Sequence, residues 1–122
     1  MSEFSELLKK RTKEFAIATI TLSKSFPKTD EGFIIKKQLL RSAFSIAANY
    51  RAACRGRSDG EFFSKLSIVV EESDEVLFWL ELLNESGICK GEEIEKNLKE
   101  AKEILSIMAR ARKTMKENSK LN

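Results

Sequence analysis

The densest cluster of titratable side chains in the sequence is residues 71–75, Glu-Glu-Ser-Asp-Glu. Two neighbouring carboxylates could bind a metal ion or work together as acid and base. They could equally be ion-pair partners for arginines that lie within apolar helical surfaces, where an unpaired charge is costly. Arg11 and Arg51 lie in such surfaces. We favour ion pairing, with this cluster as the first candidate partner of Arg11.

The sequence lacks the residues that other common catalytic sites require. The sequence has no histidine, which excludes Ser-His-Asp triads, Cys-His pairs and the Glu-x-x-His motifs of di-iron bundles. Two isolated cysteines cannot form a cysteine-rich zinc site, and no glycine-rich phosphate loop occurs. We therefore predict that the chain is not an enzyme and has no catalytic residue, metal or cofactor.

Basic side chains are the candidates for contact with a polyanion. Residues 1–57 hold 12 Lys and Arg against 5 Asp and Glu, whereas residues 58–87 hold one lysine against 8 acids. The predicted nucleic-acid-binding residues are Arg55, Arg57, Arg110, Arg112 and Lys113, and the further basic candidates are Lys36, Lys37, Arg41, Lys116 and Lys120. A solvated basic face, or a basic half packed beside an acidic segment, is the alternative interpretation.

Periodic apolar residues predict the elements that carry these groups. The pattern favours an all-α fold of one domain, 1–122, with helices at about 3–25, 30–55, 59–86 and 92–117. Thr29 is a good N-cap, Ser58 and Glu61 fit a capping box, and Gly87 suits a C-cap. Such short joints make consecutive helices antiparallel neighbours, which predicts an up-down-up-down four-helix bundle.

The predicted core uses one apolar row per helix. The rows include Phe4, Leu7, Leu8, Phe15, Ala18 and Leu22 in the first helix, Phe62, Leu66, Val69, Val76, Leu80 and Leu83 in the third, and Ile94, Leu98, Ala101, Leu105 and Met108 in the fourth.

A second apolar strip remains on the third helix, formed by Ile68, Trp79 and Leu82. The fourth helix repeats this pattern with Ile104, Ile107 and Ala111. Apolar residues on two faces of a small-bundle helix suggest burial against another subunit, so we predict a homo-oligomer with this strip at the interface. The alternative is a crowded monomer in which Trp79 is half covered.

The composition also indicates the cellular compartment. No apolar run approaches the roughly 18 residues needed to cross a bilayer, so no membrane association is expected. The charged start of the chain is unlike a signal peptide, which favours a cytoplasmic protein. Cys54 and Cys89 would lie roughly 40 Å apart at opposite ends of one helix, so both are expected to be reduced.

Three segments carry a resemblance to a known family. They are RTKEFA (11–16), QLLRSAFSIAANYRAACRGRS (38–58) and EFFSKLSIVVEESDEVLFWLELL (61–83). Over about residues 7–86 the chain resembles the bacterial four-helix bundle proteins known as 23S rRNA intervening-sequence proteins, whereas the fourth helix adds only a generic amphipathic pattern.

The resemblance implies a small bundle that assembles as a ring-like homopentamer. Some members are encoded inside large-subunit ribosomal RNA genes, and related bundles assist the reverse transcriptases of diversity-generating retroelements. No catalytic residues are implied. Two functions follow as hypotheses: an oligomer that binds RNA or DNA phosphates through a basic rim, or a protein-interaction scaffold or accessory subunit that binds no nucleic acid.

Overall fold

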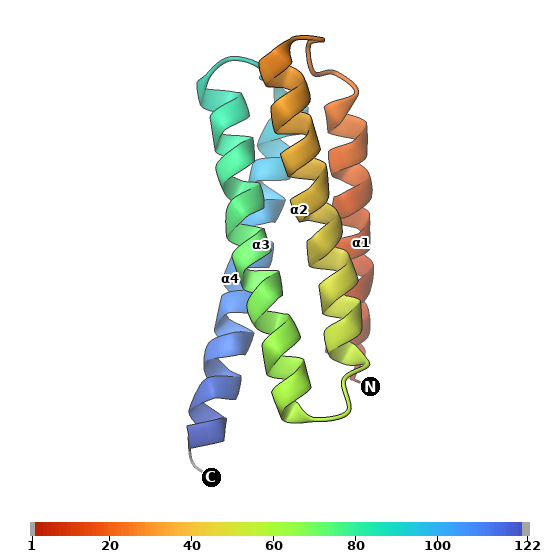
Figure 1. The fold of residues 1–122 in the computed structure, drawn as a ribbon, viewed down its shortest axis with the longest axis vertical. Helices are drawn as coiled ribbons and strands as arrows, with labels where there is room; N and C mark the ends of the chain where they lie inside the picture. The colour runs from red at the N-terminus through yellow and green to blue at the C-terminus, as the bar shows by residue number, and fades with distance from the viewer. Residues whose placement is uncertain (1, 121–122) are drawn as a thin grey trace.

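Four long helices make up the fold. The structure, a computed structural model, describes residues 2–120 and contains α1 (Glu3–Ser23), α2 (Asp30–Cys54), α3 (Asp59–Glu85) and α4 (Glu92–Lys120). Successive helices run in opposite directions, which confirms the predicted all-α bundle (Figure 1). Every helix boundary lies within three residues of its predicted position. None of the helices described is both long and apolar enough to cross a membrane.

Local hydrogen bonds explain where the helices begin and end. Thr29 and Ser58 accept hydrogen bonds from the backbone N–H groups of Gly32 and Glu61, each at 3.1 Å, as N-cap side chains do. Acidic residues occupy the first turn of every helix, where the helix dipole favours negative charge. Just beyond the end of α3, Gly87 has a φ of 80°, a left-handed conformation that glycine adopts without a Cβ clash.

The core lies along the axis of the bundle and draws on all four helices. Its fully buried large side chains are Leu8, Leu22, Leu39, Ile46, Leu66, Val69, Val76, Leu80, Leu83, Ile94, Ile104 and Met108. The predicted row of α3 is confirmed, except that Phe62 is only half-buried. In α4 the prediction was wrong at two positions, because Ile104, assigned to the second strip, is buried, and Leu105, assigned to the core, is half-buried.

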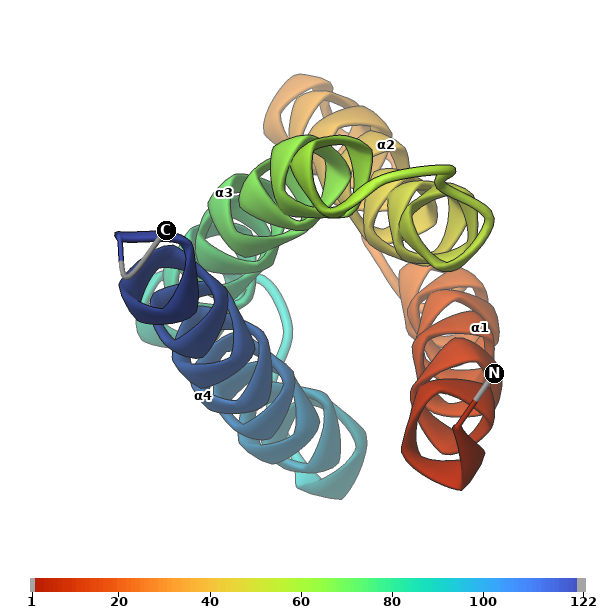
Figure 2. The ribbon, with the colours of Figure 1, turned by 90° about the horizontal axis from the view of Figure 1, so that it is seen from below.

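The helices do not close into an even square. α2 and α3 share the most extensive contact, and α1 and α4 share the sparsest. Seen from below, the C-terminal half of α4 leans away from the N-terminal half of α1 (Figure 2). Phe4 and Leu7, predicted to lie in the core, are therefore 56% and 59% exposed, because no helix covers them at this end.

Candidate functional site

Two acids of the 71–75 cluster form ion pairs, as predicted, but with an arginine that the prediction did not choose. Arg41 of α2 donates from Nη1 to Glu72 at 3.0 Å and from Nη2 to Glu75 at 2.8 Å. The Glu72 side chain is only 13% exposed. The hydroxyl of Ser73 is buried and donates to the Val69 carbonyl at 2.7 Å. These contacts stabilise the α2–α3 contact, and they remove Arg41 from the candidates for phosphate contact.

The titration of Glu75 reflects the same network. Burial alone would raise its pKa, but hydrogen bonds donated by Arg41 and by the Trp79 indole lower the pKa below its usual value. The hydrogen bonds that Arg41 donates to Glu75 and Glu72 raise the pKa of Arg41. Both side chains are therefore charged at neutral pH, as a structural ion pair requires. A carboxylate that works as a general acid would instead have to carry a proton at that pH.

Arg11 has its partners on α4. Its guanidinium donates to Glu100 at 2.7 and 2.6 Å and to Glu103 at 3.1 Å. The hydrogen bond to Glu100 is the largest cause of a raised Arg11 pKa. The expected pairing of Arg11 with residues 71–75 is wrong, because α3 lies diagonally across the bundle from α1 whereas α4 lies beside it.

Arg51 is exposed, and no carboxylate that the structure describes pairs with it. Of the apolar residues in line with it, Phe33 is 56% and Phe44 43% exposed, whereas Leu40 is half-buried. The surface of α2 that suggested a buried arginine therefore faces outward.

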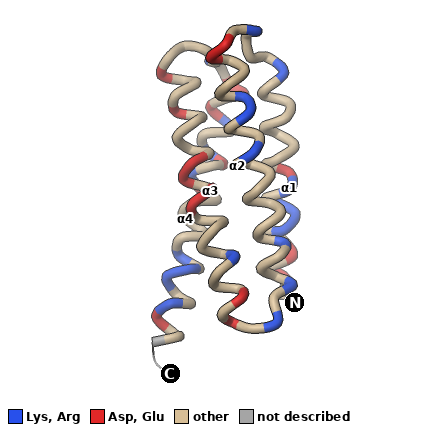
Figure 3. Tube along the Cα trace, in the orientation of Figure 1, with Lys and Arg blue, Asp and Glu red and all other residues tan. Residues whose placement is uncertain are grey.

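The predicted basic residues lie at the end of the bundle that holds the α2–α3 joint, the start of α1 and the end of α4 (Figure 3). Arg55 and Arg57 are exposed in that joint, and Arg110 and Lys113 are exposed on α4. Lys116 is exposed there as well, whereas the side chain of Lys120 lies outside the described residues. The end is not purely basic, because Asp59 and Glu61 lie between the joint and α4.

Backbone contacts hold the α2–α3 joint in shape. The Glu61 carboxylate accepts a hydrogen bond at 2.6 Å from the N–H of Arg57, one residue before the N-cap, and not from the Ser58 N–H as in a complete capping box. A Cβ on Gly56 would lie 3.1 Å from the Ala53 carbonyl and 3.2 Å from Glu61 Cβ. This joint therefore has little room for a larger residue, and it presents its two arginines in a defined place.

Arg112 differs from the other four predicted residues because α3 holds it. Its Nε donates to the Ser67 hydroxyl at 2.8 Å, and its guanidinium lies 4.7 Å from the centre of the Phe63 ring. A cation over an aromatic ring is attracted by the partial negative charge on the face of the ring. Arg112 thus joins α3 to α4 and is a less available phosphate ligand than Arg110 or Lys113.

Comparison with known proteins identifies the family. The sequence profile of the family described as 23S rRNA-intervening sequence protein matches residues 7–110. The chain belongs to the 23S rRNA-intervening sequence protein family. The match extends into α4, further than the resemblance over residues 7–86 suggested. Curated proteins give no match.

A solved structure supports the assignment to the 23S rRNA-intervening sequence protein family. It is the crystal structure of a protein of unknown function from the S23 ribosomal protein family of Bacteroides thetaiotaomicron. The two proteins are 32% identical with a TM-score of 0.80, and the alignment covers 89% of this chain and 97% of that one.

The second apolar strip of this 23S rRNA-intervening sequence protein is only partly exposed. Ile68 and Trp79 are half-buried, and Trp79 packs against the core and donates from Nε1 to Glu75 at 3.3 Å. Leu82 is 37% exposed, and Phe78, which the sequence analysis did not select, is 53% exposed. The outward apolar surface of α3 is thus centred on Phe78 and Leu82, and an interface role for the strip stays a prediction.

Proposed function

We propose that this family member is a non-catalytic homo-oligomer that binds nucleic acid through its basic end. The contacts are to phosphates, which position a strand without identifying its bases. Arg55, Arg57, Arg110 and Lys113 make these contacts, and Arg112 has a supporting role because α3 holds it.

The placement of the ion pairs is the observation that carries this proposal. Acids of α3 could neutralise a basic end, and two of them, Asp59 and Glu61, lie in its first turn directly after the joint. Glu72 and Glu75, however, are paired with Arg41, which lies 14 residues before Arg55, or about 21 Å along α2. At ordinary salt that distance is about two Debye lengths, so these acids do not cancel the charge of Arg55 and Arg57.

Assembly multiplies the charge. Exposed apolar side chains on α3, Phe78 and Leu82, support burial against other subunits. In a pentamer, the state that the sequence resemblance implies, about 20 exposed cations would lie on one rim if each subunit contributes the four named residues. Several simultaneous weak phosphate contacts then give useful affinity.

Charge reversal tests the proposal. Arg55→Glu with Arg57→Glu should weaken binding of RNA or DNA to a similar degree for every sequence. The matched control is Lys28→Glu with Lys90→Glu, the same charge change in exposed joints at the opposite end of the bundle. Equal losses in both variants would show that only net charge matters and would contradict a basic-end site.

A protein-interaction scaffold is the second candidate function. The observation in its favour is the size of the exposed apolar side chains on α2, where Phe33 is 56% and Ile34 60% accessible. If these residues bind a partner protein, Phe33→Ala with Ile34→Ala should abolish that binding and leave the nucleic-acid titration unchanged. Absence of nucleic-acid binding by the unaltered protein would favour this function.

A further inference from the structure

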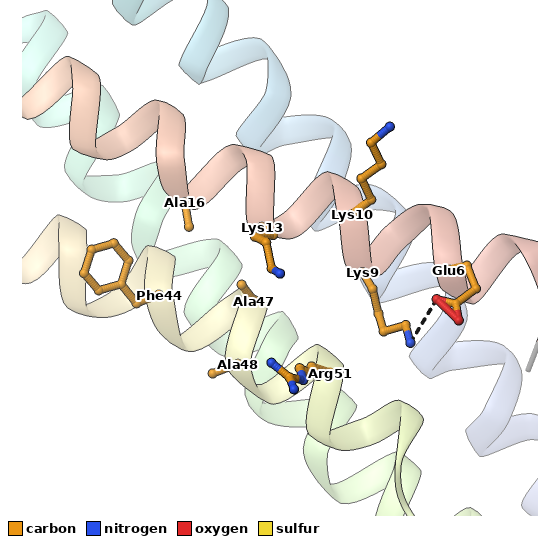
Figure 4. A pocket seen from close by; sticks show the side chains of 9 residues that line it. All are labelled: Glu6, Lys9, Lys10, Lys13, Ala16, Phe44, Ala47, Ala48 and Arg51. Carbon is orange, nitrogen blue, oxygen red and sulfur yellow. Dashed lines mark ion pairs between the residues drawn. The ribbon is translucent and has the colours of Figure 1, made fainter.

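A groove between α1 and α2 is lined by several basic side chains. It has a volume of about 580 Å³ and is lined by Glu6, Lys9, Lys10, Lys13, Ala16, Phe44, Ala47, Ala48 and Arg51. Lys13 and Arg51 reach into it from opposite sides, Lys9 lies at its lower end, and Lys10 points away from α2 (Figure 4).

The charge of the groove is poorly neutralised. Glu6 is its only acid, and it pairs with Lys9 at 2.9 Å. No described carboxylate pairs with Lys13 or Arg51, in contrast to Arg11 and Arg41, which each bind two acids. Cations that face one another across a groove repel, so an anion between them would be bound favourably.

The floor of the groove has the shape for a flat, elongated ligand. Ala16, Ala47 and Ala48 are small and let a ligand approach both helices closely. At the end away from Lys9 lies Phe44, an aromatic ring that is 43% exposed. Proteins that bind single strands combine a basic groove with exposed aromatic rings on which unpaired bases stack.

We propose that the α1–α2 groove binds a short stretch of single-stranded nucleic acid, with Lys13 and Arg51 on its phosphates and Phe44 stacked on a base. This inference rests on the proposed function and gives it a ligand class. A duplex keeps its bases stacked inside the helix and cannot offer one to Phe44. Lys9 and Ala16 are seven residues apart, so the groove is about 10 Å long and holds only a few nucleotides.

The groove opens toward the basic end. Arg51 and Arg55 are four residues apart, so they lie one turn apart on the same side of α2. A strand that leaves the groove past Arg51 therefore meets Arg55 and Arg57 next. The groove selects for a single strand, whereas the basic end adds contacts that any nucleic acid can use.

Fluorescence anisotropy with a labelled single-stranded RNA and a blunt-ended duplex of matched composition tests the inference. Phe44→Ala should weaken single-strand binding about tenfold and leave duplex binding unchanged. The matched control is Phe33→Ala, an exposed phenylalanine on the same side of α2 but outside the groove, which should change neither. Lys13→Glu should weaken single-strand binding more than Lys28→Glu does.

Three results would overturn the inference. If Phe44→Ala binds the single strand as the unaltered protein does, while Arg55→Glu with Arg57→Glu still weakens it, the groove is not the site but the proposed function stands. If Lys13→Glu dissociates the oligomer in light scattering, the groove is a contact between copies of the chain. If the unaltered protein binds neither probe at low salt, the proposed function fails with it. All the altered residues are exposed, so circular dichroism should show an intact fold.

Discussion

Arg11 on α1 holds Glu100 on α4 through two hydrogen bonds, from Nε at 2.7 Å and from Nη2 at 2.6 Å. This bidentate pair crosses the sparsest helix contact of the bundle. With Glu103 as a second acceptor at 3.1 Å, one guanidinium serves two carboxylates that lie one turn apart. The contact between the first and last helices therefore depends on charge more than any other contact in the fold.

Arg11→Met should lower the free energy of unfolding by about 1 kcal/mol, near the upper end for partly exposed pairs, because it releases both acids at once. Glu103→Gln should lower the free energy of unfolding by only a few tenths of a kcal/mol, since Arg11 keeps its hydrogen bonds to Glu100. Urea unfolding measures both changes. A larger loss from Glu103→Gln than from Arg11→Met would contradict the shared arrangement.

Acid should weaken the contact between Arg41 and Glu75. Because the pKa of Glu75 in the folded chain lies below its ordinary value of 4.5, the pair contributes stability above about pH 4.5 and loses it as pH falls through the folded pKa. Glu75→Gln should therefore reduce the slope of stability against pH below 4.5. Glu71→Gln, at an exposed position of the same helix, is the control and should leave the slope close to that of the unaltered protein.

Tyr50 offers a spectroscopic measure of burial, since it is the only tyrosine in the sequence. Burial raises its pKa from 10.0 to about 12. Its ultraviolet titration should thus occur about two pH units later in the folded protein than in urea. Because the folded pKa is the higher one, the linked stability is present below pH 10 and is lost as pH rises toward 12. Coincident titrations in both states would show that the ring is accessible.

Substitutions of two leucines of α3 should distinguish effects on folding from effects on assembly. Leu80 is fully buried, so Leu80→Ala should cost about 2–5 kcal/mol of stability. Leu82 is 37% exposed, so Leu82→Ala should change the stability of the subunit by no more than about 0.5 kcal/mol and should weaken assembly instead. Light scattering checks the second outcome, and a stable 13.9 kDa monomer of the unaltered protein at micromolar concentration would contradict the proposed oligomer.

Features that depend on neighbouring residues were predictable from the sequence. The N-cap hydrogen bond from the Glu61 N–H to the Ser58 hydroxyl and the apolar row of α3 involve residues a few positions apart, so helical spacing determines them. Short joints were enough to give the order of the helices.

Features that depend on how far the helices lean were not predictable. The exposure of Phe4 and Leu7 follows from the divergence of α4 from α1, which no local pattern encodes. The partner of Arg11 depends on which helix lies beside α1, and choosing residues 71–75 overlooked that α3 lies diagonally across the bundle. Lys9, Lys13 and Arg51 could have been grouped, since α1 and α2 were expected to be neighbours, but only the structure shows that their side chains share a groove.

The most direct test of nucleic-acid binding is a titration of labelled RNA and DNA with the unaltered protein at several salt concentrations. We expect binding at low salt that depends weakly on sequence and falls steeply as salt rises, because each neutralised phosphate of a duplex contributes about −0.9 to the slope of log affinity against log salt. An assembly that makes about six phosphate contacts should lose about a thousandfold in affinity between about 50 and 200 mM salt. No binding of either nucleic acid at tens of micromolar protein in low salt would contradict the account.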